Sequence, residues 1–178
     1  MEGRLVFDLL HHAQQGSLEV ASDALHVVEE LLLRCKAVSA RWLGSNAREF
    51  FAEFNKLLLH SDEVFYFLKR QALALLAKVL LDCTFSRSML VYVNEAKHLQ
   101  IHMNLLLDSS RAIRMQAFHI FKLFVANPRM PFPVQQILYR NRARLVQLLE
   151  GVLAVQQKED EVASGDVQKT REKLRLLA

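Results

Sequence analysis

Glycine, proline and cysteine are scarce in this chain of 178 residues, which contains 5 Gly, 3 Pro and 2 Cys. Few residues therefore break helices or form tight turns, and no segment shows the alternation of apolar and polar residues that is typical of an exposed strand. Hydrophobic residues make up 52% of the chain, which is enough to bury a sizeable core. These features predict one compact, all-α protein.

Motifs of common catalytic and cofactor sites are also missing. There is no GxSxG nucleophile motif, no HExxH zinc motif and no DxDxDG calcium loop, and the glycines are isolated rather than gathered in a phosphate-binding loop. Cys35 and Cys83 lie far apart without CxxC spacing, so we interpret them as small buried hydrophobes in a reducing compartment. We expect neither enzymatic activity nor a cofactor.

Three histidines are candidate functional residues. His98 and His102 are four residues apart on a predicted helix with Glu95 one turn before them, so they could share a face and bind zinc. No further ligand cluster accompanies them, and we interpret both as solvated helix histidines. His119 lies within an apolar helix and is interpreted as a packed histidine. No metal site is expected.

Long apolar runs and a strong charge imbalance are absent as well. No uninterrupted run approaches the roughly 18 apolar residues that a spanning helix needs, and the first residues do not form a signal peptide. The net charge is +4, from 23 basic and 19 acidic residues, and this mixture does not by itself indicate nucleic-acid binding. We expect a cytoplasmic protein that binds neither membranes nor nucleic acids.

Helical periodicity runs through most of the chain. Turns are expected at Gly44-Ser45-Asn46 and at residues 60–62. The predicted helices cover residues 4–14, 18–36, a shorter segment ending at 43, 47–59, 64–82, 87–93, 96–107, 110–128 and one or two helices within 134–155.

The end of the chain differs from the rest in composition. Residues 158–178 are rich in charge, and Ser164-Gly165 is expected to break any helix there. We predict a helical domain of residues 1–157 followed by a peripheral or partly frayed tail of residues 158–178 with a weak helix from Val167.

One helical unit recurs along the chain. A short polar residue, Ala and a large apolar residue follow one another at 23–25, 71–73 and 116–118, so the three alanines are 48 and 45 residues apart. The phrase Leu-Leu-Leu, any residue, Ser occurs at 57–61 and again at 105–109. Such a period in a helical chain is the signature of armadillo and HEAT solenoids. We therefore predict an armadillo/HEAT-like helical-repeat solenoid of about three repeats, and expect it to be a fragment of a longer array.

A peptide pocket is the first candidate binding site. Tyr66 and Arg70 are one turn apart on the predicted helix 64–82. Together with the flexible thioether of Met103, an aromatic ring and a guanidinium would suit a peptide ligand. In the third repeat helix, by contrast, Phe118, Phe121 and Phe124 are expected to serve folding rather than recognition.

A basic cluster is the second candidate. Arg140, Arg142 and Arg144 follow Tyr139 and could contact RNA or a protein. RNA-binding arrays repeat their reading residues once per unit, and no basic residue recurs in that way here. We interpret the cluster as a solvated face, with a protein-docking edge or an RNA-binding helical repeat as alternatives.

Several segments resemble one protein family. RMQAFHIFKLFVANP at 114–128, FFAEFNKLL at 50–58 and MNLL at 103–106 are similar to the calcium-binding protein 39 (Mo25-type) family, whose members are armadillo-like scaffolds that partner the STRAD pseudokinase and activate protein kinases. The resemblance covers nearly all of this chain but only the C-terminal half of the family's length. It implies a non-catalytic scaffold, monomeric within a heteromeric complex with a pseudokinase and a STE20-type kinase.

The resemblance also implies roles for particular residues. In the family a pocket receives the C-terminal Trp-Glu-Phe motif of the pseudokinase through a Tyr, an Arg one turn later and a Met, which match Tyr66, Arg70 and Met103 here. The kinase rests on the concave face, where a basic residue matches Arg140.

Three departures from the family pattern concern the expected activation of a kinase more than the expected fold. Residues 62–68 are about two residues longer than the pattern, and Ala74 stands where the family has Lys. Residues from Cys83 to Ser86 replace Arg-His-Asn-Phe and remove a basic kinase contact. A degenerate family member without kinase activation is therefore a further alternative.

Overall fold

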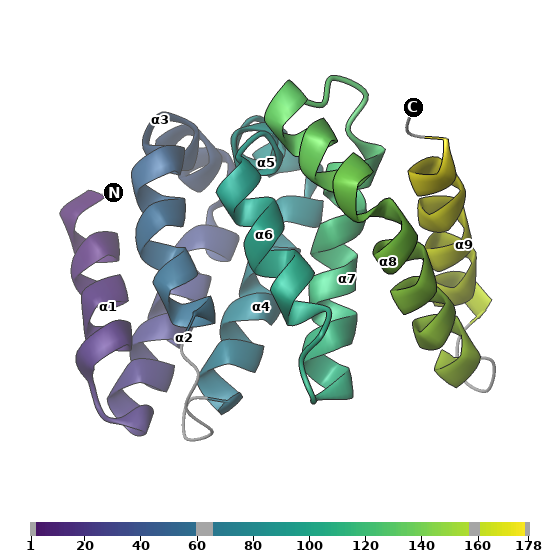
Figure 1. The fold of residues 1–178 in the computed structure, drawn as a ribbon. Helices are drawn as coiled ribbons and strands as arrows, with labels where there is room; N and C mark the ends of the chain where they lie inside the picture. The colour runs from purple at the N-terminus through teal and green to yellow at the C-terminus, as the bar shows by residue number, and fades with distance from the viewer. Residues whose placement is uncertain (1–2, 60–65, 157–160, 177–178) are drawn as a thin grey trace.

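The computed structural model describes residues 3–59, 66–156 and 161–176 (Figure 1). Within these ranges, side chains are described for all residues except residue 3 and residues 151–164. Within these ranges every regular element is a helix and none is a strand, which confirms the all-α prediction. The elements are α1 (Gly3–Gln15), α2 (Leu18–Arg34), α3 (Lys36–Phe54), η1 (Asn55–Leu58), α4 (Tyr66–Leu81), η3 (Cys83–Phe85), α5 (Ser86–Val93), α6 (Ala96–Leu105), α7 (Arg111–Ala126), α8 (Phe132–Gln156) and α9 (Glu161–Arg175).

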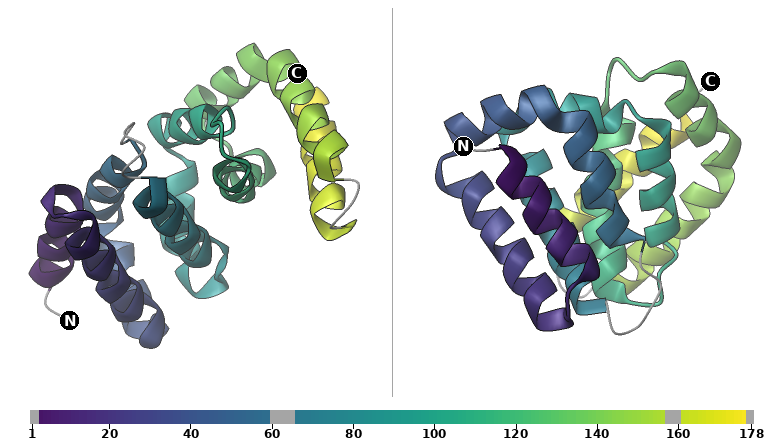
Figure 2. Two further views of the ribbon diagram at one scale, coloured as in Figure 1. Left: turned by 90° about the horizontal axis from the view of Figure 1, so that it is seen from below. Right: turned by 90° about the vertical axis from the view of Figure 1, so that its left-hand side faces the viewer.

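The helices form two layers of a solenoid. In one layer α2 packs on α4, α4 on α7 and α7 on α9, and in the other α3, α5, α6 and α8 follow one another. Seen from below, the array curves from α1 at one end to α9 at the other (Figure 2). This arrangement confirms the predicted helical-repeat solenoid.

The alanines of the sequence repeat lie where successive helices meet. Ala24, Ala72 and Ala117 are each the seventh residue of their helix, and 7%, 0% and 0% of their surface is exposed. The seventh residue of α9, Val167, is also fully buried. A small side chain lets neighbouring helices approach closely. The contact between α7 and α9 therefore adds a fourth long helix to the series that the sequence repeat marks three times.

Polar contacts cross between these helices outside the apolar seam. The hydroxyl of Ser22 on α2 donates to Oε1 of Gln71 on α4 at 3.0 Å, and Nε2 of Gln71 donates back to the Ser22 carbonyl at 3.3 Å. Lys78 on α4 pairs with Glu29 on α2. Partly exposed pairs of this kind contribute little energy each, so we assign them mainly to the register between helices.

The C-terminal segment packs more tightly than its composition predicts. Helix α9 runs through Ser164 and Gly165, so the predicted break is wrong. Val167 and Leu174 are fully buried, and Asp166 pairs with Lys122 of α7. A glycine inside a helix costs about 1 kcal/mol, which this packing offsets. The predicted boundary at residue 157 lies outside the described residues and stays a prediction.

The predicted turn at Gly44-Ser45-Asn46 is also wrong, because α3 continues through it. The Ser45 hydroxyl and the Asn46 amide donate to the carbonyl groups of Arg41 and Trp42, four residues earlier, at 3.4 and 2.8 Å. These bonds satisfy the polar side chains within the helix instead of ending it. The other predicted turn, at residues 60–62, falls outside the described residues.

Both cysteines are exposed, contrary to the expectation that they are buried. Cys35 separates α2 from α3, and Cys83 begins η3. Each therefore lies where the chain changes direction rather than on an inward helical face. The three phenylalanines Phe118, Phe121 and Phe124 are fully buried, as expected for residues that serve folding.

A buried polar cluster connects η1, α5 and α6. The hydroxyl of Tyr92 lies 3.0 Å from Oδ1 of Asn55 and 2.8 Å from Nε2 of His102. His98 stacks on the Tyr92 ring, with 4.3 Å between centroids, and its Nδ1 donates to the Tyr92 carbonyl at 3.0 Å. Both histidines are buried, so the expectation of solvated helix histidines is wrong. The His102 ring also packs against Phe124 of α7, with 6.0 Å between centroids, and so contributes to the contact between the two layers.

Burial keeps the ring of His102 neutral. Removal from water lowers the pKa of His102 to about 3 and also lowers the pKa of His98, while it raises the pKa of Tyr92. Nδ1 of His102 has no hydrogen-bond partner within the described structure. A second proton on this ring would therefore be buried without compensation. His119 is half-buried, and desolvation lowers its pKa as well.

We expect the free energy of unfolding to fall as the pH drops below 6.5. The unfolded chain protonates His102 near pH 6.5, whereas the folded chain protonates it only near pH 3, so the unfolded state binds the extra proton first. At pH 5 this one group should cost about 2 kcal/mol. Urea unfolding by circular dichroism at pH 7.5, 6 and 5 should show a weaker pH dependence in His102→Gln than in wild type. Equal pH dependence of the two proteins, with exposed His26→Gln as control, would contradict this role.

We also expect Ala72→Leu to destabilise the solenoid. The added atoms would be forced between α4 and its neighbours at a site with no exposed surface, and overpacking of this kind typically costs about 1–3 kcal/mol. Ala52→Leu, on the exposed side of α3, is the matched control and should change stability by less than about 0.5 kcal/mol. Thermal melting of both variants tests this, and a lower melting temperature for the control than for Ala72→Leu would refute the packing role.

Candidate peptide-binding site

The start of α4 presents two of the predicted site residues to solvent. Tyr66 is the first residue of the helix, and Arg70 follows one turn later. Leu68 and Ala72 occupy the inward face, which leaves Tyr66 and Arg70 on the outside, with 39% of Tyr66 exposed. The helical period alone therefore places a phenol and a guanidinium side by side on the surface.

A hydrogen bond holds Tyr66 against the start of α7. The Tyr66 hydroxyl lies 2.9 Å from the Ser110 hydroxyl, and either atom can be the donor. Ser110 is the N-cap of α7, where its oxygen accepts from the backbone N–H of Ile113 at 3.4 Å. The Ser110 side chain thus caps α7 and orients the first residue of the neighbouring helix α4.

The loop between α6 and α7 is held in place by its own charged residues. The carboxylate of Asp108 accepts from the backbone N–H of Ser110 at 2.8 Å. The guanidinium of Arg114 donates to the carbonyl groups of Asp108 and Ser109 at 2.7 and 2.8 Å. Lys69, which is half-buried, lies 4.0 Å from Asp108, so part of its charge is compensated. These contacts give Tyr66 a rigid neighbour.

The sequence predicted that Ser110 starts this helix, which the N-cap confirms, but not that Ser110 bonds to Tyr66. The supporting residues Asp108 and Arg114 were missed. A partial signal was present, because the Leu-Leu-Leu-Asp-Ser phrase of the repeat ends at this loop and two serines precede an apolar-periodic helix. The signal predicts a helix start and not a hydrogen bond to Tyr66, since the bond joins residues 44 positions apart.

Met103 lies on α6. It is half-buried and packs against the hydrophobic core, two residues before α6 ends. Helices α4 and α6 both pack on α7. The three predicted residues thus lie on two helices that share a neighbour, and a single pocket formed by Tyr66, Arg70 and Met103 stays a prediction.

The basic cluster lies on α8. Arg140 and Arg144 are exposed, and the guanidinium carbon of Arg142 lies 4.9 Å from the ring centroid of Tyr139, within the range of a cation–π contact. This contact covers part of the Tyr139 ring, 46% of whose residue surface is exposed. Arg142 therefore has a partner within the chain.

The positions that depart from the family pattern differ in exposure. Cys83 and Ser86 are exposed, and Ala74 is half-buried on α4. Beside Cys83, Asp82 accepts a hydrogen bond from Lys36 at 2.7 Å and another from the backbone of Thr84 at 2.9 Å. The Lys36 bond, followed by the Thr84 bonds, lowers the pKa of Asp82 to about 2. The extra residues of segment 62–68 fall largely outside the described structure.

In the described part of the chain, no three His, Cys, Asp or Glu side chains are placed so that they could share a metal ion. None of the described helices is both long and apolar enough to cross a bilayer.

Comparison with known proteins identifies relatives along almost the whole chain. The profile of the family described as Mo25-like matches residues 2–174. A putative MO25-like protein of Arabidopsis thaliana is 40% identical over 166 residues, which are 93% of this chain and 47% of the relative. The degreening-related gene dee76 protein of Auxenochlorella protothecoides is 41% identical over 150 residues, 84% of this chain and 46% of the relative. The human calcium-binding protein 39-like protein is 35% identical over 142 residues, 80% of this chain and 41% of the relative.

These matches confirm the resemblance on which the site prediction is based. The chain spans less than half the length of these relatives, so the match concerns their shared helical region and leaves the activity of the complete proteins aside. With a family profile that covers residues 2–174 and a solenoid of the expected class, this chain belongs to the Mo25-like family.

Proposed function

We propose that this protein is a non-enzymatic scaffold that binds the C-terminal Trp-Glu-Phe-type peptide of a pseudokinase through Tyr66, Arg70 and Met103. The observation that carries the proposal is the Tyr66–Ser110 hydrogen bond, which orients an exposed aromatic ring one turn from an exposed arginine. A side chain that is already oriented loses less entropy when a ligand binds.

The chemistry of the three side chains fits such a peptide. The guanidinium of Arg70 can hold a carboxylate with two parallel hydrogen bonds, which suits a glutamate or a terminal carboxyl group. Tyr66 offers an aromatic face and Met103 a polarizable thioether, and both favour contact with aromatic rings. Since Lys69 is partly compensated by Asp108, Arg70 is the cation at the start of α4 that remains available to a ligand.

The proposal extends to a kinase. Arg140 on α8 is exposed and could contact an acidic region of a kinase domain, and we infer that a STE20-type protein kinase docks there in a cytoplasmic complex with the pseudokinase. The substitutions at Ala74, Cys83 and Ser86 concern this second step, in which the kinase is activated, and not the binding of the peptide.

We expect Arg70→Ala and Met103→Ala each to weaken peptide binding roughly tenfold or more, equivalent to about 1.4 kcal/mol. The measurement is isothermal titration calorimetry with an acetylated ten-residue peptide that ends in Trp-Glu-Phe and keeps its free carboxyl group. Tyr66→Phe should weaken binding less, because the ring stays and only the bond to Ser110 is lost.

Arg144→Ala is the matched control, since it removes an exposed arginine from α8 and should leave the affinity unchanged. Circular dichroism of each variant shows whether it is folded. If folded Arg70→Ala and Met103→Ala both bind the peptide as wild type does, the pocket assignment fails.

A further inference from the structure

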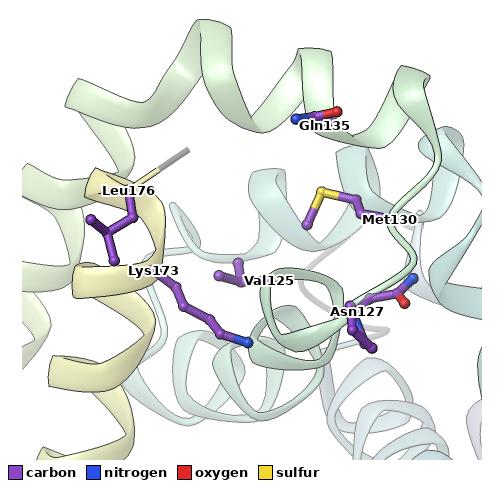
Figure 3. Close-up of a pocket in the computed structure, with 7 residues that line it drawn as sticks. Val125, Asn127, Met130, Gln135, Lys173 and Leu176 are labelled. Carbon is purple, nitrogen blue, oxygen red and sulfur yellow. The ribbon is translucent and has the colours of Figure 1, made fainter. Parts of the chain in front are cut away.

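Two neighbouring cavities lie between α7 and α9, away from Tyr66 and its partners. One has a volume of about 390 Å³ and the other about 300 Å³. Val125 and Lys173 line both, so the cavities adjoin one another at the end of α7. Figure 3 shows the residues that line the larger one. The larger one falls within the size range of ligand sites in proteins.

The walls of the larger cavity are polar and apolar in equal parts. Val125, Pro128, Met130 and Leu176 supply the hydrocarbon and thioether surface, and Figure 3 shows Met130 and Leu176 on opposite sides of Val125. Leu176 is 81% exposed, so an apolar group bound here would cover surface that now contacts water. This apolar part of the wall suits an apolar side chain.

Two polar side chains of this cavity, Asn127 and Gln135, differ in whether they are free to bind a ligand. The amide of Asn127 donates to Asn94 at 2.9 Å and its oxygen accepts from the backbone N–H of Arg129 at 3.0 Å, so Asn127 shapes the wall. Gln135 lines the cavity from α8, with an amide that can both donate and accept. It could bind the main chain of a peptide.

The smaller cavity combines a mainly apolar surface with a net positive charge. Lys122, Lys169 and Lys173 line it together with one carboxylate, Asp166, which Lys122 binds directly. The ammonium of Lys173 donates one hydrogen bond to the carbonyl of Ala126 at 3.3 Å and retains two further protons. Two lysines therefore remain to attract an anion.

Among the described side chains, no carboxylate forms an ion pair with Lys169 or Lys173. On α8, Glu150 binds Arg171 and Arg175 of α9 at 3.5 and 3.2 Å. The charge of Asp166 is shared first with Lys122, whose hydrogen bond is the main cause of the lowered pKa of that carboxyl. The positive charge beside the apolar cavity is thus left for a ligand.

We propose that the two cavities together bind an extended acidic peptide, with a bulky apolar side chain against Val125, Met130 and Leu176 and a carboxylate at Lys169 and Lys173. Leu176 follows Lys173 by three positions and Lys169 by seven, which corresponds to roughly 4.5 to 10.5 Å along a helix. Side chains two residues apart on one face of an extended peptide are separated by roughly 6.7 Å, which lies within this range. The expected motif is an apolar residue and an acidic residue with one residue between them.

This site is separate from the proposed Trp-Glu-Phe pocket. Ser110, which holds Tyr66, caps the start of α7, whereas Val125 lies one residue before its end. The 15 residues between them correspond to roughly 22 Å of helix. Loss of one site therefore need not affect the other.

The test uses the full chain labelled with ¹⁵N and the probe acetyl-Gly-Phe-Gly-Glu-Gly-amide. We expect amide chemical shifts to change at the end of α7, at Met130 and along α9, and not at Tyr66 or Arg70. Lys169→Glu and Lys173→Glu should each weaken binding at least tenfold. Because Lys173→Glu also removes the bond to Ala126, Lys169→Glu is the decisive variant, and its melting temperature should match that of wild type.

Matched controls separate this site from general charge attraction. Arg144→Glu makes the same charge change on α8 and should alter the affinity less than twofold, and Arg70→Ala should leave it unchanged. Probes in which Phe is replaced by Gly, or Glu by Gln, should each bind at least fivefold more weakly. The proposal is overturned if Lys169→Glu binds like wild type, if Arg144→Glu weakens binding equally, or if the probe lacking Phe binds as well as the complete one.

Discussion

Close packing between successive long helices is the constraint on which the rest of this structure depends. Ala24, Ala72 and Ala117 lie at the same position of α2, α4 and α7, where a larger side chain would push the helices apart. Each helix therefore buries the face of the next, and the array stays continuous as far as α9. A solenoid has no central core, so its stability is the sum of these interfaces between neighbours.

The buried polar contacts among η1, α5 and α6 connect these elements but make the stability of the fold depend on pH. Tyr92, His98, His102 and Asn55 share hydrogen bonds inside an otherwise apolar region, and the cluster is stable only while the histidines are neutral. Both candidate binding sites of this array lie at the ends of helices. Tyr66 and Ser110 meet where α4 and α7 begin, and the acidic-peptide cavities lie where α7 ends.

The candidate site was only partly accessible from sequence. The helical period puts Tyr66 and Arg70 on one exposed face, and similarity to the Mo25-like family selects them among many surface pairs. The residues that support Tyr66 come from the loop before α7 and from the first turn of α7. Neither spacing nor composition connects Asp108 or Arg114 with Tyr66. The cavities between α7 and α9 could not be predicted from the sequence either, because residues 158–178, which form one side of them, were expected to be a loose tail.

The sequence by itself determined the class of fold and the repeat, because the helical period and the spacing of the alanines are local, regular signals. Only the tertiary structure decided the conformation and the burial of residues whose local sequence does not strongly favour one outcome. Gly44 and Gly165 stay helical since their neighbours are packed, His98 and His102 are buried by the helices around them, and Cys35 and Cys83 are exposed where the chain turns. For the two glycines, the packing of the surrounding helix outweighs a preference of about 1 kcal/mol against the helix.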